Sequence, residues 1–294
     1  MNARSTDTYR TRFQQVLTYI DAHLAEDLDV NRLSDVAAYS KHHFVRQFSE
    51  LFGMGVYKYV QLSRLKRAAQ RLAFRNDQSV TDIALDSGYD SAESFSRAFK
   101  KSSGQTPTDF RRQPQWTPWH ETFRPLASLR IHHMHKPIHA HQVQRVDVSA
   151  TKIAVLEHRG DPNHLGDSIR NFIAWRKRNH LHPSRYATFN LLYDDPEQVA
   201  PDAYRFDLCV AIDRDIEPDT SGIVTKTIPA GRCAVLRHIG SDDMLGQSIA
   251  YLYAQWLPES GEEPRDFLLY LQRVRFFPDV PEHEALTDIF LPLK

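Results

Sequence analysis

Two stretches of this chain share one pattern: Ala38-Tyr39-Ser40-x3-Phe44-x-Arg46-x-Phe48-x4-Gly53 and Gly88-Tyr89-Asp90-x4-Phe95-x-Arg97-x-Phe99-x4-Gly104. From Phe44 onward the offset between them is a constant 51 residues. Each copy places a tight turn before a short helix that has apolar residues on its inner face and an arginine on its outer face. That arrangement is typical of a helix-turn-helix, whose second helix enters the DNA major groove. Two copies predict a reader of two adjacent major-groove segments.

The residues around both copies favour helices throughout the first 112 residues. Ser40 and Ser79 are candidate N-caps, and Gly88 can adopt the positive φ of a sharp turn. Ala38 stands where the second copy has glycine, which predicts a less regular first turn. A long helix over 56–73 would extend about 27 Å. It would act as a spacer between the two readers.

The charge is distributed unevenly along a chain whose net charge is zero. Residues 1–112 hold 17 Lys and Arg against 13 Asp and Glu, whereas residues 113–294 hold 20 against 24. Between Ala38 and Asn76 there are eight basic residues and one acid, Glu50. This segment is a candidate footprint for phosphate, and a solvated basic helix is the alternative.

The second copy is followed by Thr106-Pro107-x-x-Phe110-Arg111. With both turn-helix units and their spacing, this ending resembles the DNA-binding domain of the AraC/XylS family of transcription regulators over about residues 10–112. In that family the two recognition helices enter adjacent major grooves of one asymmetric site, so a monomer can bind.

The resemblance implies DNA contacts from the two recognition helices. The candidates are Ser40, Lys41, His42, His43, Val45 and Arg46 in the first, and Ser91, Glu93, Ser94, Arg97 and Lys100 in the second. Arg46 and Arg97 are suited to guanine. Lys41, Lys100 and the basic residues of the 56–73 helix are expected at phosphates, which fix the register on DNA.

The segment 113–145 has the composition of a linker between two domains. It contains four prolines together with Trp116 and Trp119, and the tryptophans indicate that it packs against something. Residues 131–141 contain five histidines, which allow either a metal site or a half-exposed strand. No cysteine or clustered acid completes a metal site, so no metal is predicted.

A second repeat occupies the C-terminal half, with an offset of 80 residues. Ala154-Val155-Leu156-x-His158-x-Gly160-x4-Leu165-Gly166-x-Ser168-Ile169 returns as Ala234-Val235-Leu236-x-His238-x-Gly240-x4-Leu245-Gly246-x-Ser248-Ile249. Extended apolar runs follow each copy. The pattern predicts an α+β domain over 146–294, built from a duplicated strand-helix-strand-strand unit. Its pseudo-twofold axis would hold a cleft, with both helices on one face of the sheet.

This half resembles the gyrase-inhibitor-like effector domain of multidrug-sensing regulators. The matching motifs include Tyr193-Asp194-Asp195-Pro196-Glu197, Arg205-Phe206-Asp207-Leu208-Cys209 and Trp256-Leu257-Pro258-Glu259-Ser260-Gly261. The resemblance implies a site for amphipathic, often cationic, small molecules. Candidate ligand residues are Glu157, Phe172, Trp175, Tyr193, Phe206, Tyr253, Trp256, Tyr270 and Asp288, and core packing is the alternative for each aromatic one.

Two departures from that family bear on the ligand. Leu268 stands where a glutamate is common, and Cys233 where tyrosine is frequent. A buried carboxylate stabilises a cationic ligand in an apolar cleft. Its loss favours a neutral or anionic ligand, unless Glu157 or Asp288 substitutes.

Composition excludes several classes of protein. No apolar run is long enough to span a membrane, and the N-terminus has no signal core, so a cytoplasmic protein is expected. Cys209 and Cys233 match no metal or redox spacing and are expected to be core thiols. No cofactor is predicted.

The sequence therefore predicts a regulator with an all-α DNA-binding domain over 1–112, a linker over 113–145 and the effector domain over 146–294. Its expected partners are double-stranded DNA, a hydrophobic or amphipathic effector and RNA polymerase. It is expected to act as a monomer and not as an enzyme. Activation is the expected direction, although no residue fixes the sign. The alternatives are a small-molecule hydrolase and a gyrase- or nucleoid-directed protein of the gyrase-inhibitor-like class.

Overall fold

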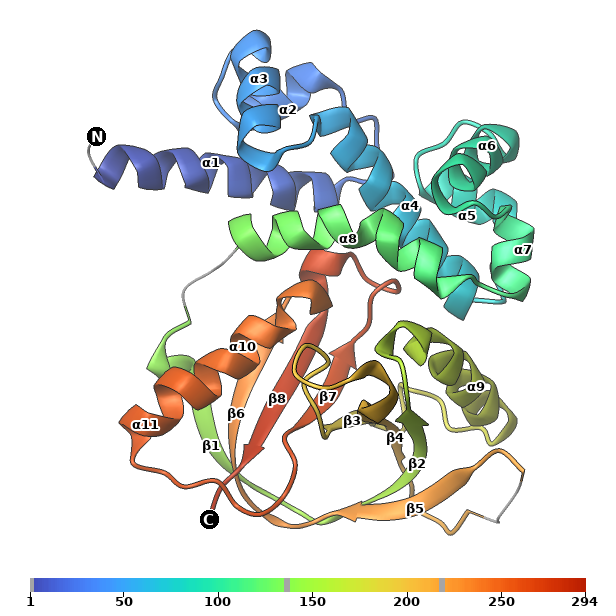
Figure 1. The fold of residues 1–294 in the computed structure, drawn as a ribbon, viewed down its shortest axis with the longest axis vertical. Helices are drawn as coiled ribbons and strands as arrows, with labels where there is room; N and C mark the ends of the chain where they lie inside the picture. The colour runs from blue at the N-terminus through green and yellow to red at the C-terminus, as the bar shows by residue number, and fades with distance from the viewer. Residues whose placement is uncertain (1–2, 135–137, 217–219) are drawn as a thin grey trace. The chain divides into compact units, whose positions relative to one another are not determined.

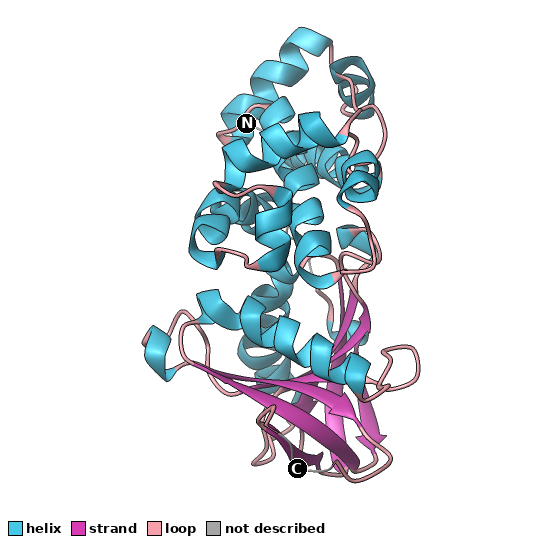
Figure 2. Ribbon diagram, turned by 90° about the vertical axis from the view of Figure 1, so that its right-hand side faces the viewer, coloured by secondary structure: helices cyan, strands magenta, loops and turns pink. Residues whose placement is uncertain are grey.

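A computed structural model describes residues 3–134, 138–216 and 220–294, and the chain divides into two compact units. The first contains Met1–Lys136 together with Phe277–His283, and the second contains Pro137–Phe276 together with Glu284–Lys294. The first unit is built of helices, and the strands of the sheet belong to the second (Figures 1 and 2). The predicted fold class, all-α followed by α+β, is confirmed.

The helical unit contains two helix-turn-helix pairs joined by a long helix. Its helices are α1 (Ala3–Ala22), α2 (Val30–Val36), α3 (Lys41–Phe52), α4 (Val56–Phe74), α5 (Val80–Asp86), α6 (Ala92–Ser103), α7 (Pro107–Arg112) and α8 (Trp116–His133). The pairs are α2–α3 and α5–α6, and α4 is the predicted spacer. Capping side chains explain several of the helix starts: the Ser79 hydroxyl accepts from the Asp82 N–H at 3.0 Å, and that of Ser91 from the Ser94 N–H at 3.1 Å.

The turns inside the two pairs have the same backbone conformation. Ala38 has φ 54° and Gly88 has φ 73°, so both are left-handed. In each turn the following tyrosine donates its N–H to the carbonyl five residues earlier: Tyr39 to Ser34 at 3.0 Å, and Tyr89 to Ala84 at 3.1 Å. The expectation of a less regular first turn is wrong. The surrounding fold imposes on Ala38 a conformation that its Cβ disfavours.

Aromatic side chains form the core of the helical unit. The two copies of the repeated pattern each contribute two buried phenylalanines: Phe44 and Phe48, and Phe95 and Phe99. Phe13 of α1 lies with its ring centroid 6.1 Å from that of Phe44 and 6.3 Å from that of Phe48. The spacing of four residues between the two phenylalanines of each copy therefore places both rings on the inner face of the second helix of each pair.

The structure differs from the predicted linker over 113–145. Residues Trp116–His133 form helix α8, which belongs to the helical unit (Figure 1). Trp116, Trp119 and Phe123 are buried in its core. Apolar burial outweighs the linker-like composition, and Pro125 is accommodated inside the helix. The half-exposed strand considered for 131–141 is wrong as well, because α8 continues to His133.

Four charged side chains are buried together in the helical unit. Arg130 of α8 lies 2.7 Å from Asp21 of α1 and 3.2 Å from Glu282. Glu282 also lies 3.0 Å from Lys66 of α4. These side chains, named here the buried quartet, are no more than 10% exposed. Glu282 comes from the segment between two strands of the other unit, yet it completes the charge balance of this core.

The second unit contains one antiparallel sheet, which has eight strands in the part of the chain that the structure describes. They are β1 (Val143–Val148), β2 (Thr151–Arg159), β3 (Thr188–Leu192), β4 (Arg205–Ala211), β5 (Ile223–Ile228), β6 (Gly231–Ile239), β7 (Tyr270–Arg275) and β8 (Leu286–Pro292), in the order β1-β6-β8-β7-β3-β4-β2-β5. The helices are α9 (Leu165–Arg178) and α10 (Leu245–Tyr251), which continues through a π-helical turn (Leu252–Trp256) into α11 (Leu257–Ser260). Short 3-10 turns lie at Ala140–Gln142, Pro162–His164, Pro201–Ala203, Asp242–Met244 and Glu282–Glu284.

Each copy of the repeat is preceded by one strand that was not predicted. That strand pairs with the other copy instead of its own. β1 precedes the first copy but pairs with β6 of the second, and β5 precedes the second copy but pairs with β2 of the first. β1 and β2 are six positions apart in the sheet, about 29 Å if it were flat. Only residues 149 and 150 connect them. The sheet must therefore curl, which gives it a concave inner face (Figure 1).

The two faces of the sheet have separate cores. Phe172 and Trp175 of α9 pack with alternate residues of β2 and β4, and Trp256 packs with residues of β6, β7 and β8. The opposite residues of the same strands form a third cluster, which includes Phe189, Tyr270 and Phe290. Because side chains alternate along a strand, this third cluster occupies the inner face.

We expect Ala38→Gly to stabilise the helical unit by about 0.5–1 kcal/mol, because left-handed backbone costs an L-residue about 1–2 kcal/mol and the entropy cost of glycine cancels only part of that gain. Gly88→Ala is the matched reverse change. It should be destabilising, since the added Cβ would lie 2.7 Å from the Arg64 guanidinium carbon. Urea unfolding of both variants measures the two effects. A less stable Ala38→Gly variant would contradict this account of the turn.

We expect Glu282→Gln to lower the free energy of unfolding of the helical unit by about 3 kcal/mol, because Lys66 and Arg130 would stay buried with one carboxylate between them. Hydrogen-exchange mass spectrometry of peptides from α1, α4 and α8 measures the loss. Glu284→Gln is the control, because Glu284 and Arg275 form a half-exposed pair at 3.5 Å. That change should cost less than about 1 kcal/mol. Equal effects of the two substitutions would refute a special contribution of the quartet.

Candidate functional site

The outer face of α3 presents the residues predicted to contact DNA. Lys41, His42, His43, Val45 and Arg46 are all exposed. Ser40 is also exposed and occupies the N-cap position, although its hydroxyl makes no capping bond in the described structure. Because Phe44 and Phe48 face the core, only the opposite side of α3 is accessible to a ligand.

The outer face of α6 is equivalent but has a different charge pattern. Glu93, Arg97 and Lys100 are exposed, whereas Ser91 and Ser94 are partly buried and bonded to each other in the helix cap. Hydrogen bonds from its own backbone N–H and from Ser91 lower the pKa of the Glu93 carboxyl. Arg46 and Arg97 occupy the same repeat position, and both are exposed.

Two basic residues of α4 and its C-cap residue Arg75 form ion pairs with acids of the protein. Arg71 binds Asp86 at 2.7 Å, Arg75 binds Asp279 at 2.5 Å, and Lys66 belongs to the buried quartet. Lys66 is buried and cannot reach a phosphate, whereas phosphate contacts from Arg71 and Arg75 stay a prediction. Lys58 is exposed at the start of the helix.

Arg64 has a role that the sequence did not reveal. Its guanidinium donates to the carbonyls of Leu24 at 2.9 Å, Glu26 at 2.6 Å and Gly88 at 3.2 Å. Leu24 and Glu26 precede the first helix-turn-helix pair, and Gly88 forms the turn of the second. Arg64 therefore fixes the two helix-turn-helix pairs to the same helix, α4. Burial lowers the pKa of the Arg64 guanidinium, and its three hydrogen bonds to backbone carbonyls hold the group in place.

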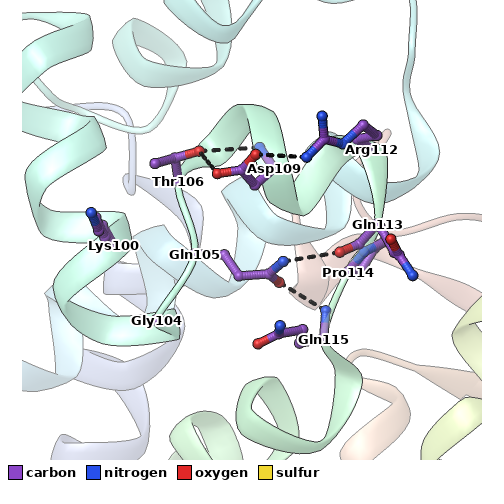
Figure 3. Close-up of a pocket in the computed structure, with 9 residues that line it drawn as sticks. All are labelled: Lys100, Gly104, Gln105, Thr106, Asp109, Arg112, Gln113, Pro114 and Gln115. Carbon is purple, nitrogen blue, oxygen red and sulfur yellow. Dashed lines mark hydrogen bonds and ion pairs between the residues drawn. The ribbon is translucent and has the colours of Figure 1, made fainter.

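A polar hollow of about 500 Å³ lies beside the end of α6 and α7 (Figure 3). Its lining groups are bonded to one another. The Thr106 hydroxyl binds the Asp109 carboxylate at 2.7 Å, and the Gln105 amide bonds the Gln113 carbonyl and the Gln115 N–H. These bonds hold the turn between α7 and α8, so we assign the hollow a structural role.

The inner face of the curled sheet holds an apolar pocket of about 240 Å³. It is lined by Val148, Ser149, Thr151, Phe189, Ile228, Tyr270, Gln272 and Phe290. These residues come from strands of both halves of the sheet, so the two copies of the repeat contribute jointly to the pocket. Burial raises the pKa of the Tyr270 phenol, which keeps it a hydrogen-bond donor.

The predicted ligand residues are divided between the two faces of the sheet. Tyr270 lines the pocket, and Glu157, Tyr193 and Asp288 occupy the same face by strand register. Four aromatic candidates, Phe172, Trp175, Phe206 and Trp256, are buried in the helix-side cores. Tyr253 is 44% exposed on the helical segment. Residue type and spacing could not separate the two faces, because both are rich in aromatics.

The charged groups of the inner face are paired. Lys226 Nζ lies 2.6 Å from Asp207, 2.7 Å from Glu157 and 3.1 Å from the Tyr193 hydroxyl. Burial by itself would lower the pKa of the Lys226 ammonium, but its bonds to Asp207 and Glu157 outweigh burial and raise it. On the second copy, Arg237 binds Asp288 through two bonds at 2.7 and 2.8 Å.

Cys209 and Cys233 are free and buried, as predicted for core thiols, and burial raises the pKa of both. Among the described residues, no group of three or more His, Cys, Asp or Glu side chains could hold a metal ion. His135 of the histidine cluster lies outside those residues. No helix in the described ranges has both the length and the apolar character needed to cross a membrane.

Two family models match the chain, one for each half. Residues 33–113 match a helix-turn-helix domain, and residues 141–294 match the GyrI-like small molecule binding domain. This combination defines a transcription regulator with a DNA-binding domain and a small-molecule-binding domain. The chain belongs to the GyrI-like family and has an AraC-type helix-turn-helix domain before it, which confirms both resemblances.

Two relatives of this chain are named as transcriptional regulators. The chain is 34% identical over 152 residues to the probable transcriptional regulator YgiV of Escherichia coli K12, covering 51% of this chain and 95% of YgiV. It is 37% identical over 100 residues to the uncharacterized HTH-type transcriptional regulator SACOL0084 of Staphylococcus aureus, covering 34% of this chain and 13% of that protein. EcmrR, solved in an EcmrR–DNA complex, is 14% identical over 89% of this chain and 84% of its own, with a TM-score of 0.44.

Proposed function

We propose that this protein is a sequence-specific DNA-binding regulator that reads two adjacent major-groove segments through α3 and α6. The observation that carries the proposal is the repeated geometry: two pairs with the same turn conformation present Arg46 and Arg97 at equivalent exposed positions. The spacer α4 is 19 residues long, about 28 Å. That length is close to the ~34 Å of one DNA turn.

The exposed residues divide into base readers and phosphate contacts. Arg46 and Arg97 are suited to bond guanine bidentately, and Glu93 can accept from cytosine. Lys41 and Lys100 are assigned to phosphates. Since α3 carries His42, His43 and Val45 where α6 carries Glu93 and Ser94, the two helices would prefer different sequences. An asymmetric site bound by a monomer follows from that difference.

The effector is a small hydrophobic molecule bound in the inner-face pocket, where Phe189, Tyr270 and Phe290 offer aromatic surfaces and Gln272 offers a polar group. Effector binding would change DNA affinity or contact with RNA polymerase in the cytoplasm. We propose binding without catalysis. Both thiols are buried, and the carboxylates Glu157, Asp207 and Asp288 are held by cations, which leaves them poorly placed as nucleophiles or bases.

The DNA-binding proposal is tested with a site selected by the full-length protein from a random DNA pool. Arg46→Ala and Arg97→Ala should each cost about 1–3 kcal/mol of affinity and relax the preference at one base pair. Lys41→Ala and Lys100→Ala should each lower the affinity for all DNA sequences alike. Each should also reduce the slope of log affinity against log salt concentration by about 1.

Lys177→Ala is the matched control, because Lys177 is an exposed base on α9 of the other unit. It should leave both affinity and salt slope unchanged. Wild-type affinity in both arginine variants would refute the assignment of the readers. A ratio of specific to non-specific affinity near one would favour the nucleoid-directed alternative.

The effector site is tested by thermal shift with a panel of small aromatic compounds. A ligand of the folded state raises the melting temperature of the wild type. Phe290→Ala should abolish that rise, because it removes a ring from the pocket. Phe172→Ala removes a ring of the same size from the helix-side core, so it should lower the melting temperature but keep the rise. The opposite result would place the ligand among the helix-side aromatics.

A further inference from the structure

The inner face of the sheet carries one facing pair of charged residues in each copy of the repeat. Glu157 of β2 lies directly opposite Asp207 of β4, and Arg237 of β6 lies directly opposite Asp288 of β8. Glu157 and Arg237 are separated by the 80-residue repeat offset. The same position therefore holds an acid in one copy and a base in the other.

In the first copy two carboxylates face each other, which is destabilising without a cation between them. Lys226 provides that cation from β5, the exchanged strand. It is 28% exposed, while Asp207 is only 3% exposed and receives a further bond from the Tyr193 hydroxyl at 3.0 Å. Arg159 binds the outer side of Glu157 at 2.9 Å. The two carboxylates are thus matched by two bases.

In the second copy the acid is matched by its direct neighbour. Arg237 holds Asp288 with the two-bond geometry in which a guanidinium binds a carboxylate most strongly. Asp288 is 12% exposed, whereas the Arg237 side chain is 55% exposed. The partly buried Asp288 carboxylate is therefore neutralised by a guanidinium, that of Arg237, which is exposed to solvent.

Both acids lie near the pocket by strand register. Asp288 is directly opposite Gln272, which lines the pocket. Asp207 is opposite Leu191, which in turn is opposite the pocket residue Tyr270. A cation in this pocket would need a carboxylate to replace its water. Both neighbouring carboxylates are already engaged by the protein's own bases.

We propose that the effector is an uncharged aromatic molecule, and that Arg237 and Lys226 are the specificity residues that exclude organic cations from the pocket. This inference rests on the proposed effector site on the inner face. It predicts a gain of function: removing either base should expose a partly buried carboxylate beside the pocket and admit a cation.

The test uses two isosteres that differ only in charge, 1-methylnaphthalene and the 1-methylquinolinium cation, titrated against the full-length protein by ligand-observed NMR. Wild type should prefer the neutral compound by about tenfold or more, ~1.4 kcal/mol. Arg237→Met should reduce or invert that preference by improving the affinity for the cation. Lys226→Met should act in the same direction, with a smaller effect because Asp207 lies one strand further from the pocket.

Arg237→Met/Asp288→Asn and Lys226→Met/Asp207→Asn are the controls, since each removes the acid together with its base. Both should restore the preference for the neutral compound. Circular dichroism checks that every variant folds. Wild type that binds the cation as tightly as the neutral compound would overturn the specificity proposal and leave the effector site standing. If neither compound binds any variant, the proposed site itself fails, and this inference with it.

Discussion

The buried quartet is the interaction on which the helical unit depends. Isolated charges cannot be buried in an apolar core, so Asp21, Lys66, Arg130 and Glu282 are stable only as a set. Three of them come from helices α1, α4 and α8, and α4 also holds both helix-turn-helix pairs through Arg64. The fourth arrives on the segment between β7 and β8, strands that carry the pocket residues Tyr270 and Phe290. Phe277–His283 therefore belongs to the helical unit, although it lies in sequence between two strands of the sheet.

Strand exchange has a comparable role in the second unit. Because β1 and β5 each pair with the other copy, the sheet must curl, and its inner face becomes a pocket instead of an open surface. The exchange also brings Lys226 of the second copy to Asp207 and Glu157 of the first. One topological feature thus determines the shape of the pocket and the charge that surrounds it.

Sequence patterns predicted most of the architecture because they report local physics. The two Phe-x-x-x-Phe spacings placed the inner faces of α3 and α6 correctly, and the 80-residue repeat predicted the duplicated sheet and its pseudo-axis. The errors arose where long-range packing outweighed local preference. Ala38 adopts a left-handed turn that its Cβ disfavours, and α8 forms across a proline-rich stretch because Trp116 and Trp119 are buried by other helices.

Helical periodicity assigns each side chain of α3 and α6 to a face without knowledge of its neighbours, so the outward-facing residues of both helices could be predicted from the sequence. The sequence also determined the family and the number of repeats. The sequence could not predict which charged side chains remain unpaired and accessible, because that depends on the folded chain. Lys66 binds a carboxylate that is distant in the sequence, and Arg64 donates to backbone carbonyls that are also distant. Glu157 binds Lys226 of a distant strand, and Asp288 binds Arg237 of the facing strand. The physical reason is that the effect of a charge depends on its partners and its burial, and both are set by contacts between residues far apart in the chain.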